Sequence, residues 1–423
     1  VTLHGRIQSV RKQGKKLMFL QIGAMDHIVH ACIEHSFLGT DEAFETAQSG
    51  LVGATKGSYV EVEGMPRLSA KGRLQLMARR VKLLSTCLHR VPEHYTDIQK
   101  RMRHRHIDFM VNVQSKQTML TRSKIVHRIR SILHDRDFVE VETPVLQASA
   151  SGAAARPFTT KATIDRDLQL KIAPELALKR AVVGGLLRVF ELGKCFRNER
   201  LSPRHNPEFT TCEYYEAFGT LEKLITDTQT MLRDIEQVVR KDSPSDAPLI
   251  FEHFQQLDFV KTLEQCLGET LPRTQLDLLD LFARHNLTLP TETTIPELLD
   301  SLAGLYLEPL CQQPTFLVNH PAELSSLAKS TDGISHRFEL IVNGVELINA
   351  YEEENDPLLQ RVKFEAQAKA SGRTGLTADE DDYCKVLEWG MPPTAGWGLG
   401  VDRLCMLLCG QTRINEVLLD GGI

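Results

Sequence analysis

The chain has 423 residues, of which 42% are hydrophobic and 25% charged, and its net charge at pH 7 is −5. This length allows two or three domains with separate cores, and the composition is ordinary for a globular protein. A net negative charge excludes a molecule that attracts nucleic acid over its whole surface, although a local basic patch can still do so.

Residues 1–88 are predicted to form a β-barrel. Five segments have strand-like apolar patterns, with a helix expected at 41–48 after the third: 1–10, 16–22, 27–33, 59–63 and 74–84. This is the element order of an oligonucleotide-binding (OB) fold, which stacks bases on aromatic side chains and follows the backbone with cations. The candidates are Arg6, Phe19, Lys15, Lys16, Lys71 and Arg73. Alternatively, Phe19 is a core residue and the lysines form a solvated face.

Residues 89–118 are interpreted as a basic linker, because they contain the run QKRMRHRHIDF. Such a cluster is usually solvated, but it could also hold a nucleic-acid backbone or a carboxylate of another domain. A helical pattern begins at Met119, and DFVEVETPVL is typical of a strand that stops at Pro144.

Residues 119–423 are predicted to form an α+β domain. Strands are expected at 167–172, 188–192, 209–215, 337–342 and 345–351, and helices at 174–183, 221–240 and 402–408. The Asn343–Gly344 turn predicts a hairpin, so the sheet should be mostly antiparallel with flanking helices. Residues 241–330 are rich in proline and are expected to be a less regular insertion with helices at 258–267 and 295–308.

The cysteines and the ends of the chain give weaker signals. The nine cysteines include no CxxC pair, which argues against a zinc site and favours a reducing compartment. No apolar run approaches the roughly 20 residues of a membrane span. The sequence opens at Val1 inside a predicted strand, so a targeting segment or extension stays open.

Four stretches carry residues suited to nucleotide chemistry. In CFRNERLSPRHNPEFT, Arg197 on the first of two strands can hold a phosphate bidentately, and Phe209 on the second can stack a base. In RFELIVNGVELINAYEEENDP, Glu339 and Glu346 flank the hairpin turn and could bind Mg²⁺ that bridges phosphates. KIAPELALK sets Glu175 at a strand-to-helix turn.

The fourth stretch, GWGLGVDRL, has three alternating glycines on a strand, where a flat ligand can approach the backbone, followed by Arg403 at a helix start. The spacing is GxGxG rather than GxGxxG, and no GxxxxGK[ST] loop is present. A Rossmann site and a P-loop are therefore disfavoured, and nucleotide binding requires another architecture.

These stretches together resemble the class II lysyl-tRNA synthetases, and the resemblance runs over nearly the whole chain. It rests on DFVEVETP, FRNER…RHNPEF, GWGLGVDR, APEL, HNPEFTTCEYYEAF, NGVELINAYEEENDP and GMPPTAGWGLGVDRL in order. The resemblance implies an anticodon-binding OB barrel before an antiparallel-sheet catalytic domain. It also implies ATP, L-lysine and tRNA(Lys) as substrates, Mg²⁺ as cofactor, and a homodimer through the element around Pro144.

The resemblance assigns one set of residues to ATP. Arg197 would contact the α-phosphate and the amino-acid carboxylate, and Phe209 would stack the adenine with Arg403 on its other face. The remaining implied contacts are Glu199 to the adenine amino group, His205 and Asn206 near the phosphates, and Glu339 and Glu346 to Mg²⁺. His205 and Asn206 could instead be surface residues of the loop.

A second set would bind lysine, because a buried ammonium must meet carboxylates. Glu353, Glu213 and Tyr215 would contact the ε-ammonium, and Glu175 with the Gly152 backbone the α-ammonium. Asn349 would face the carboxylate, with Tyr351 and Gly398 completing the pocket and Arg6 and Phe19 contacting the anticodon from the barrel. Glu213 could instead be a structural carboxylate. Glu352 and Glu354 alternate with Glu353 and are expected to point away.

The chain departs from the family pattern at several positions. Ser151–Gly152 replaces a paired glycine, Arg200 stands where a glycine is common, and Glu352 and Glu354 are more acidic than usual. Arg73 occupies the place of an anticodon-reading glutamate, which puts the details of anticodon recognition in question. The chain also ends at VLLDGGI, short of the usual tail.

Three other functions compete with this one. An aspartyl- or asparaginyl-tRNA synthetase needs cations facing the substrate side chain, which Glu175 and Glu353 oppose. A protein-lysylating ligase of this ancestry lacks the barrel, and a noncatalytic tRNA-binding paralogue should have lost some of Arg197, Glu339, Glu346 or Arg403. A cytoplasmic location is expected, with a mitochondrial one left open.

Overall fold

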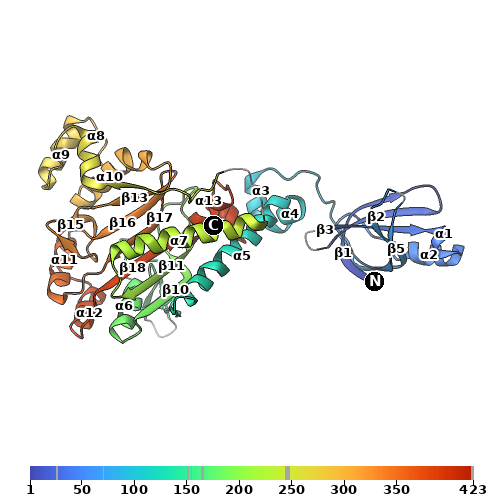
Figure 1. Cartoon of the computed structure of the whole chain (residues 1–423), viewed down its shortest axis with the longest axis horizontal. Coiled ribbons are helices and arrows are strands. Elements are labelled where there is room, and N and C mark those ends of the chain that lie inside the picture. Colours follow the sequence, from blue (N-terminus) through green and yellow to red (C-terminus); the bar gives the residue numbers. More distant parts are fainter. Residues whose placement is uncertain are drawn as a thin grey trace. The chain divides into compact units, whose positions relative to one another are not determined.

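We describe a computed structural model that covers residues 1–24, 27–69, 71–149, 152–153, 155–162, 166–242 and 248–420. The chain divides into two compact units, Val1–Lys116 and Gln117–Ile423 (Figure 1). Within the described ranges, no helix has the length and apolarity needed to cross a membrane.

The first unit is a closed barrel of strand order β1-β2-β3-β5-β4. The strands are β1 (Thr2–Lys12), β2 (Leu17–Ala24), β3 (His27–Glu34), β4 (Tyr59–Leu68) and β5 (Leu74–Ser85), and helices α1 (His35–Leu38) and α2 (Asp41–Ser49) follow β3. The predicted OB order is confirmed. The alternation that predicted the strands fills the barrel, because Met18, Leu20 and Ile22 of β2 are all buried.

The segment predicted as a linker contains two short helices, α3 (Ile98–Arg103) and α4 (Arg105–Val111). Part of its basic run has a local structural role, because Arg101 Nε lies 2.8 Å from Asp108 Oδ1 and Arg105 also pairs with this buried carboxylate. Helix α5 (Val113–His134) begins before Met119, where the sequence pattern placed its start.

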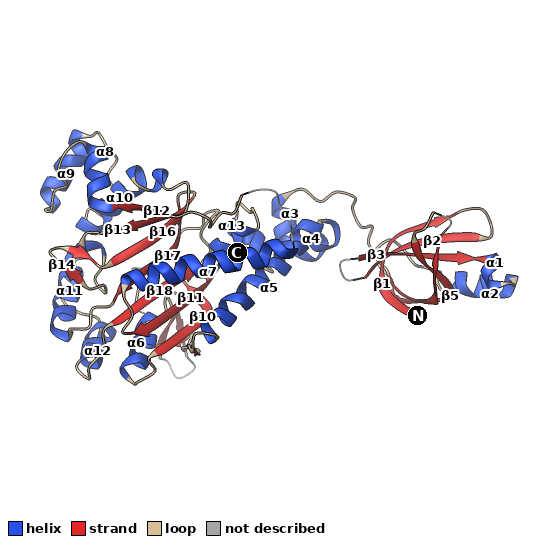
Figure 2. Cartoon of the chain, viewed as in Figure 1, coloured by secondary structure: helices blue, strands red, loops and turns tan. Residues whose placement is uncertain are grey.

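The second unit is built on an eight-stranded sheet of order β12-β13-β16-β17-β18-β11-β10-β6 (Figure 2). The outer pairs β6–β10 and β12–β13 are parallel and the pairs between them antiparallel. The strands are β6 (Val139–Glu140), β10 (Arg188–Phe196), β11 (Glu208–Ala217), β12 (Gln255–Asp258), β13 (Thr315–Val318), β16 (Arg337–Val342), β17 (Val345–Glu352) and β18 (Thr394–Gly400). The predicted antiparallel sheet with flanking helices is confirmed.

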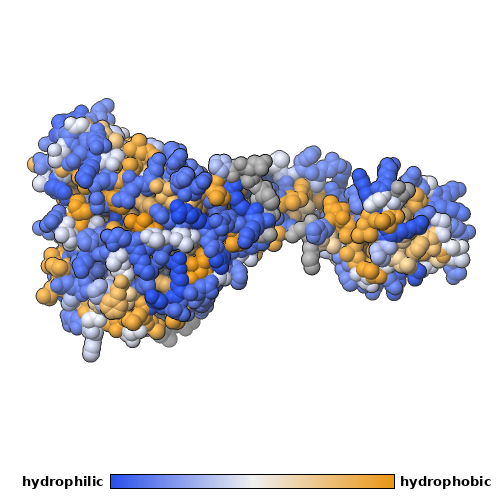
Figure 3. Space-filling model, in the orientation of Figure 1, coloured by the Kyte–Doolittle hydropathy of each residue, from blue (hydrophilic) through white to orange (hydrophobic). Residues whose placement is uncertain are grey.

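The remaining elements surround this sheet. The small sheets contain β7 (Leu146–Gln147), β8 (Thr159–Lys161), β9 (Asp167–Leu170), β14 (Ser330–Thr331) and β15 (Ile334–Ser335). The helices are α6 (Glu175–Val183), α7 (Leu221–Asp242), α8 (Phe259–Leu267), α9 (Gln275–Arg284), α10 (Ile295–Tyr306), α11 (Pro357–Ala370), α12 (Ala378–Leu387) and α13 (Val401–Leu408). The face of the molecule in Figure 3 is largely hydrophilic, with hydrophobic side chains interspersed.

The sequence prediction missed the helix α9 and the strands β12 and β13 of the 241–330 segment. Thr274 caps α9 through its side chain, and the helix buries Leu278, Leu281 and Phe282. These residues join α8 and α10 in a separate hydrophobic core. The helical spacing was therefore present in the sequence, but the surrounding prolines obscured it.

One face of the main sheet is closed by α7. Tyr214 of β11 stacks on Trp397 of β18 with ring centroids 4.9 Å apart. The Trp397 Nε1–H donates to Thr228 Oγ1 of α7 at 2.9 Å, and both side chains are buried. Because strand side chains alternate, the neighbours of Tyr214 and Trp397 point to the opposite face.

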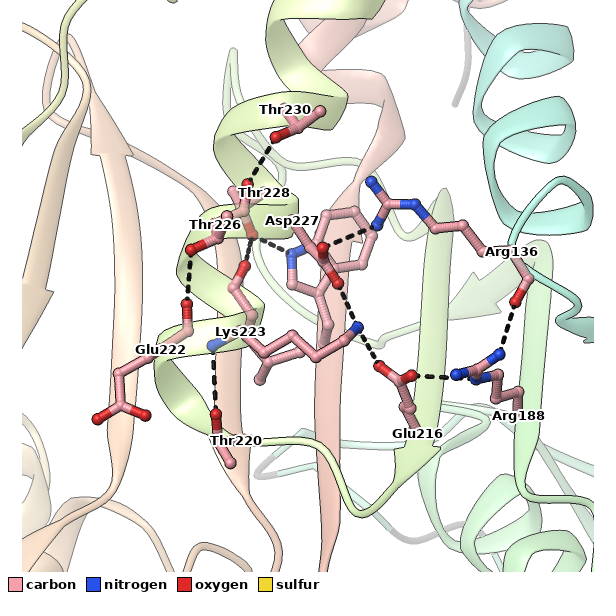
Figure 4. Close-up of polar contacts among 12 residues, drawn as sticks. Arg136, Arg188, Glu216, Thr220, Glu222, Lys223, Thr226, Asp227, Thr228 and Thr230 are labelled. Atoms are coloured by element: carbon pink, nitrogen blue, oxygen red, sulfur yellow. Dashed lines mark hydrogen bonds and ion pairs between the residues drawn. The ribbon is translucent and has the colours of Figure 1, made fainter.

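An ion-pair chain fixes α7 to the edge of this face (Figure 4). Lys223 Nζ lies 2.6 Å from Glu216 Oε2 and 2.7 Å from Asp227 Oδ2. Glu216 also accepts from Arg188 Nε at 3.0 Å, and Arg136 Nη1 lies 3.3 Å from Asp227 Oδ1. Helix α7 thus covers this face of the sheet, and the candidate site lies on the opposite face of the same strands.

Candidate active site

Two rows of residues cross three adjacent strands on the face opposite Trp397. In the first row, Gly398 of β18 is in register with Glu213 of β11 on one side and Asn349 of β17 on the other. In the second row, Gly396 lies between Tyr215 and Tyr351 in the same way. The two glycines place no side chain on this part of the sheet face, which we call the trough, and the four flanking residues were all predicted to contact lysine.

Gly396 is the first of the three alternating glycines but was not among the predicted lysine contacts, and the packing requires a glycine there. A Cβ atom at this position would collide with Glu353 Oε1 and with the Tyr215 ring. Gly398 is less restricted, because a Cβ there would lie 3.5 Å from Glu213 Cγ. The glycine at position 396 thus leaves the space that the Glu353 side chain occupies.

As predicted, the side chains of Glu352 and Glu354 point away from the site that Glu353 enters. Glu353 is buried and pairs with Lys179 of α6. Glu352 instead accepts from the Leu221 backbone N–H at 3.0 Å, and Glu354 pairs with Lys363 Nζ at 2.7 Å.

Lys179 is the main residue of the site that sequence reasoning missed. It is fully buried one helical turn after Glu175, and its Nζ donates to Glu175 Oε1 at 2.5 Å while also pairing with Glu353. The Tyr351 hydroxyl donates to the same Glu175 oxygen at 2.5 Å. Nζ also lies 5.5, 5.7 and 5.9 Å from the ring centroids of Tyr351, Tyr215 and Tyr383.

The cluster contains three acidic side chains, Glu175, Glu213 and Glu353, but a single basic one, Lys179, and burial together with this imbalance shifts the pKa values of Glu213, Glu353 and Lys179. Burial, and then Glu175, raise the pKa of Glu213 to about 8. Burial also raises the pKa of Glu353 well above its usual range, with Lys179 opposing the rise. Burial lowers the pKa of Lys179, but Glu175 and Glu353 outweigh it and the net shift is upward. The cluster therefore favours additional cations.

Gly152 lies beside this cluster, as predicted. Its φ of +91° is in the left-handed region, and a Cβ atom there would lie 3.3 Å from Glu175 Cβ. Ser151, the other half of the departure from the family pattern, lies outside the described residues. Position 152 thus requires both the conformation and the small size of glycine.

The strands β10 and β11 and the loop between them hold five of the residues predicted to bind ATP. Phe209 is in register with Cys195, and the Arg197 guanidinium carbon lies 5.1 Å from the Phe209 ring centroid. The Arg197 Nε–H donates to the Ile172 carbonyl at 3.3 Å. Glu199 is exposed in the loop that follows, and Asn206 donates to the Glu208 carbonyl at 2.7 Å.

Arg403 is held by partners from two elements. Its Nη1 donates to the Glu346 carbonyl oxygen at 2.7 Å and its Nη2 lies 3.0 Å from His205 Nε2. Partial burial, and then Arg403, lower the pKa of His205, so the neutral ring accepts at Nε2. Its Nδ1–H then donates to Ser202 Oγ at 2.7 Å. His205, Glu346 and Arg403 therefore form one group, and their roles toward ATP stay a prediction.

Buried contacts fix the start of α13 relative to Phe209. Asp402 Oδ2 accepts from the Thr210 backbone N–H at 2.7 Å, and Asp402 Oδ1 lies 2.6 Å from Arg122 Nη1. Because Asp402 precedes Arg403 and Thr210 follows Phe209, these bonds set the separation of the two predicted adenine contacts.

Arg337 connects the amino-acid trough to the predicted metal ligands and was also missed. Its Nε donates to Asn349 Oδ1 at 2.9 Å, and its Nη2 pairs with Glu339. The Asn349 amide NH₂ is therefore the group left to donate to a carboxylate partner. Buried His320 lies 3.5 Å from the same Glu339 carboxylate.

The two predicted Mg²⁺ ligands lie on adjacent strands of the β16–β17 hairpin. Burial opposes ionisation of Glu339, but Arg337 and His320 lower its pKa to about 2, so it is a carboxylate at neutral pH. Burial, followed by Glu339 and Glu346, raises the pKa of Asp300. Among the described residues, no group of three or more His, Cys, Asp or Glu side chains forms a metal cage. Two carboxylates fit Mg²⁺, which completes its shell with phosphates and water.

In the barrel, the two predicted anticodon contacts lie on the outer face of β1 and β2. Phe19 is half-buried between the buried residues Met18 and Leu20, so it is not a core residue. The Arg6 guanidinium carbon lies 4.6 Å from the Tyr59 ring centroid. The role of both residues stays a prediction.

Comparison with known proteins identifies the class of this site. Residues 97–419 match the family model of class II tRNA synthetases for D, K and N. The chain is 39% identical to a lysine–tRNA ligase, cla4, of Cladosporium cladosporioides, with 99% of this chain and 75% of the relative covered. It is 38% identical to the mitochondrial lysine–tRNA ligase of Schizosaccharomyces pombe, covering 100% and 84%, and 36% identical to a lysine–tRNA ligase of Bacillus cereus, covering 99% and 86%.

The chain therefore belongs to the class II tRNA synthetases of the aspartate, lysine and asparagine group, and within it to the lysine–tRNA ligases. The family resemblance read from the sequence motifs is confirmed.

Proposed function

We propose that this chain activates L-lysine with ATP in the trough of β11, β18 and β17 and transfers the lysyl group to tRNA(Lys). Family membership makes it an ATP-dependent aminoacyl-tRNA ligase. The observation that carries the choice of lysine is the enclosure of Glu353, Glu213 and Glu175 around the two glycines of the trough.

The trough favours lysine over the acidic and amide substrates of sister enzymes. An aspartate side chain would need an available cation, whereas the buried cation Lys179 is already paired with Glu175 and Glu353. In the proposed mode, Glu353, Glu213 and Tyr215 receive the ε-ammonium, and Glu175 with the Gly152 backbone receives the α-ammonium. Asn349, Tyr351 and Gly398 complete the pocket around the carboxylate end.

The chemical step needs no protein nucleophile. A lysine carboxylate oxygen attacks the α-phosphorus of ATP, the bond from that phosphorus to the bridging oxygen breaks, and pyrophosphate leaves. A terminal ribose hydroxyl of tRNA then attacks the carbonyl and AMP leaves. Arg197 and Arg403 stabilise the phosphate charge, and positioning supplies the remainder of the rate.

The residues around the phosphates have separate proposed roles. Phe209 stacks the adenine, Glu199 accepts from its amino group, and His205 with Asn206 lies near the phosphates. Glu339 and Glu346 would hold Mg²⁺, which neutralises phosphate charge. This proposal is supported by the ionised state of Glu339.

The domain roles follow the same division. We propose that residues 1–88 bind the anticodon through Arg6 and Phe19. Residues 89–118 would link this barrel to the catalytic domain, which spans residues 119–423 and contains an insertion at about 241–330. The outward position of Phe19 supports base stacking.

We also propose that the chain forms a homodimer through the element around Pro144. Val139 on the short edge strand β6, and Val145 and Leu146, before and at the start of β7 in a separate small sheet, are about half-exposed. An exposed apolar sheet edge is a surface that a second copy can cover. A dimeric mass by light scattering is expected, and a monomeric mass with full activity would contradict this.

All nine cysteines are free in the structure. This supports a reducing compartment, and we propose the cytoplasm.

The function is tested by charging bulk tRNA with each amino acid, using the purified chain, ATP and Mg²⁺. Lysine should be esterified to tRNA. Charging with aspartate or asparagine in its place would overturn the proposal.

A further inference from the structure

The amino-acid trough contains a cation of the protein itself. Lys179 is fully buried, and its ammonium contacts the two carboxylates, Glu175 and Glu353, that are proposed to receive the two ammonium groups of the substrate. A buried cation among substrate-binding groups either competes with the substrate or completes the charge of its site.

The charges around Lys179 can be counted from each element packed against it. Helix α6 contributes Glu175, β11 contributes Glu213 and Tyr215, the end of β17 contributes Tyr351 and the adjoining Glu353, and α12 contributes Tyr383. Burial raises the pKa of Tyr215 and Tyr351 far above 10, so these phenols stay neutral. The cluster thus has three carboxyl groups and one ammonium, and bound ammonium groups favour the ionised form of those carboxyls whose pKa burial raises.

This count matches one substrate class. Lysine carries two ammonium groups, and its carboxylate is proposed to meet Arg197 and Asn349 outside this cluster. With two further ammonium groups, the three carboxylates are balanced by three cations. An unpaired buried charge is costly, so the balance depends on the internal cation as much as on the substrate.

The geometry indicates that Lys179 balances the carboxyl groups together with the substrate and does not compete with the substrate for them. Lys179 is anchored one helical turn after Glu175, and its Nζ faces the three tyrosine rings at 5.5 to 5.9 Å. Its hydrogen bond uses Oε1 of Glu175, and its contact with Glu353 uses Oε2. The opposite oxygen, Glu353 Oε1, is the atom that lies against Gly396. Each carboxylate therefore contacts Lys179 through one oxygen, and its other oxygen is not used in that contact.

We propose that Lys179 is a positioning and specificity residue, whose ammonium bridges Glu175 and Glu353 and sets the charge of the trough so that it accepts a substrate with two ammonium groups. The inference rests on the proposed function of the trough.

The test measures lysine-dependent ATP–pyrophosphate exchange by the full chain in two backgrounds. In the natural background, Lys179→Met should raise the KM for lysine about ten- to hundredfold and leave the KM for ATP within about twofold, because one buried carboxylate loses its partner. In the Glu353→Gln background the cluster has two carboxylates, so removing Lys179 restores the balance. There Lys179→Met should lower the KM for lysine or leave it unchanged.

A merely structural lysine would have the same effect in both backgrounds, whereas the charge balance predicts a rise of lysine KM in the natural background only. An equal rise of lysine KM in both backgrounds, or no change in either, would overturn the proposal, and a lower KM in the natural background would show competition instead. If Lys179→Met does not fold, Lys179→Gln carries the same expectations, because it removes the charge and keeps a hydrogen-bond donor.

The matched control is Lys363→Met. It breaks a lysine–glutamate pair at Glu354, the residue next to Glu353, with a separation of 2.7 Å. This variant should lose stability without a selective rise of lysine KM. Absence of lysine-dependent exchange by the unmodified chain would refute the proposed function, whereas exchange with an unresponsive Lys179 would refute only this inference.

Discussion

The proposed amino-acid trough and the proposed phosphate-binding region both include residues of β17 but differ in how their charges are paired. In the trough, Glu353 and Lys179 are fully buried and meet each other directly. In the phosphate region, Arg403 and Glu346 remain partly exposed, with side-chain exposures of 24% and 41%. Under the proposed function, a buried ion pair lets the trough disfavour a substrate side chain of the wrong charge, whereas partly exposed charges in the phosphate region would attract phosphates with less selectivity.

The largest effect is expected from removing a charge in the trough. Glu353→Gln keeps the shape but leaves the substrate ammonium without its buried partner, a loss of about 3–5 kcal/mol. The kcat/KM for lysine should fall by about two to four orders of magnitude in pyrophosphate exchange, with little change in the KM for ATP.

Glu352→Gln is the matched control, since Glu352 accepts from Leu221 N–H and contacts His336 outside the trough. If Glu352→Gln were as damaging as Glu353→Gln, the assignment of the trough to lysine would be wrong.

The converse variant is Arg403→Ala. It removes charge-assisted hydrogen bonds worth about 1.5–3 kcal/mol, so the KM for ATP should rise about ten- to hundredfold while the KM for lysine changes little. Arg284→Ala, which breaks a surface pair with Glu269, should be silent. A rise confined to the KM for lysine would remove the distinction between the two regions.

Phe19→Ala tests whether the barrel has a role in tRNA binding that is independent of the trough and of the phosphate region. Loss of one stacked base costs about 1–3 kcal/mol, so the KM for tRNA should rise about tenfold while pyrophosphate exchange is unchanged. Phe37→Ala, another aromatic residue of this unit, provides the comparison. Unchanged tRNA charging by Phe19→Ala would exclude its proposed contact.

The smallest effect is a pH dependence of lysine binding. Burial and Glu175 raise the pKa of Glu213 to about 8, so this carboxyl is protonated below that pH. Lysine favours the ionised form, so binding releases a proton and the KM for lysine should fall several-fold as pH rises towards 8. Glu213→Gln should abolish this change, and an opposite slope in the unmodified chain would contradict the assigned ionisation.

Much of this arrangement was predictable because local patterns encode it. The strand alternation around Glu213 and Tyr215, the GxGxG spacing and the Asn343–Gly344 turn all have direct counterparts in the structure, with positive φ at both turn residues. The family motifs added residue roles that spacing alone does not give.

The parts that were missed depend on contacts between distant segments. Lys179 lies on a short helix and looks like any helical lysine until the fold brings Glu353 to it from the end of β17. The role of Arg337 likewise depends on its contacts with Glu339 on the same strand and with Asn349 on the other strand of the hairpin. The hydrophobic periodicity of a sequence does not predict which distant carboxylate will pair with a given lysine or arginine.

The central claim is that the charge of the trough selects a dicationic amino acid, and pyrophosphate exchange with each amino acid in turn tests it most directly. We predict exchange with lysine and none above background with aspartate or asparagine. Equal exchange with aspartate would show that Lys179 is available to an acidic side chain, which would contradict the selection of lysine by the buried carboxylates of the trough.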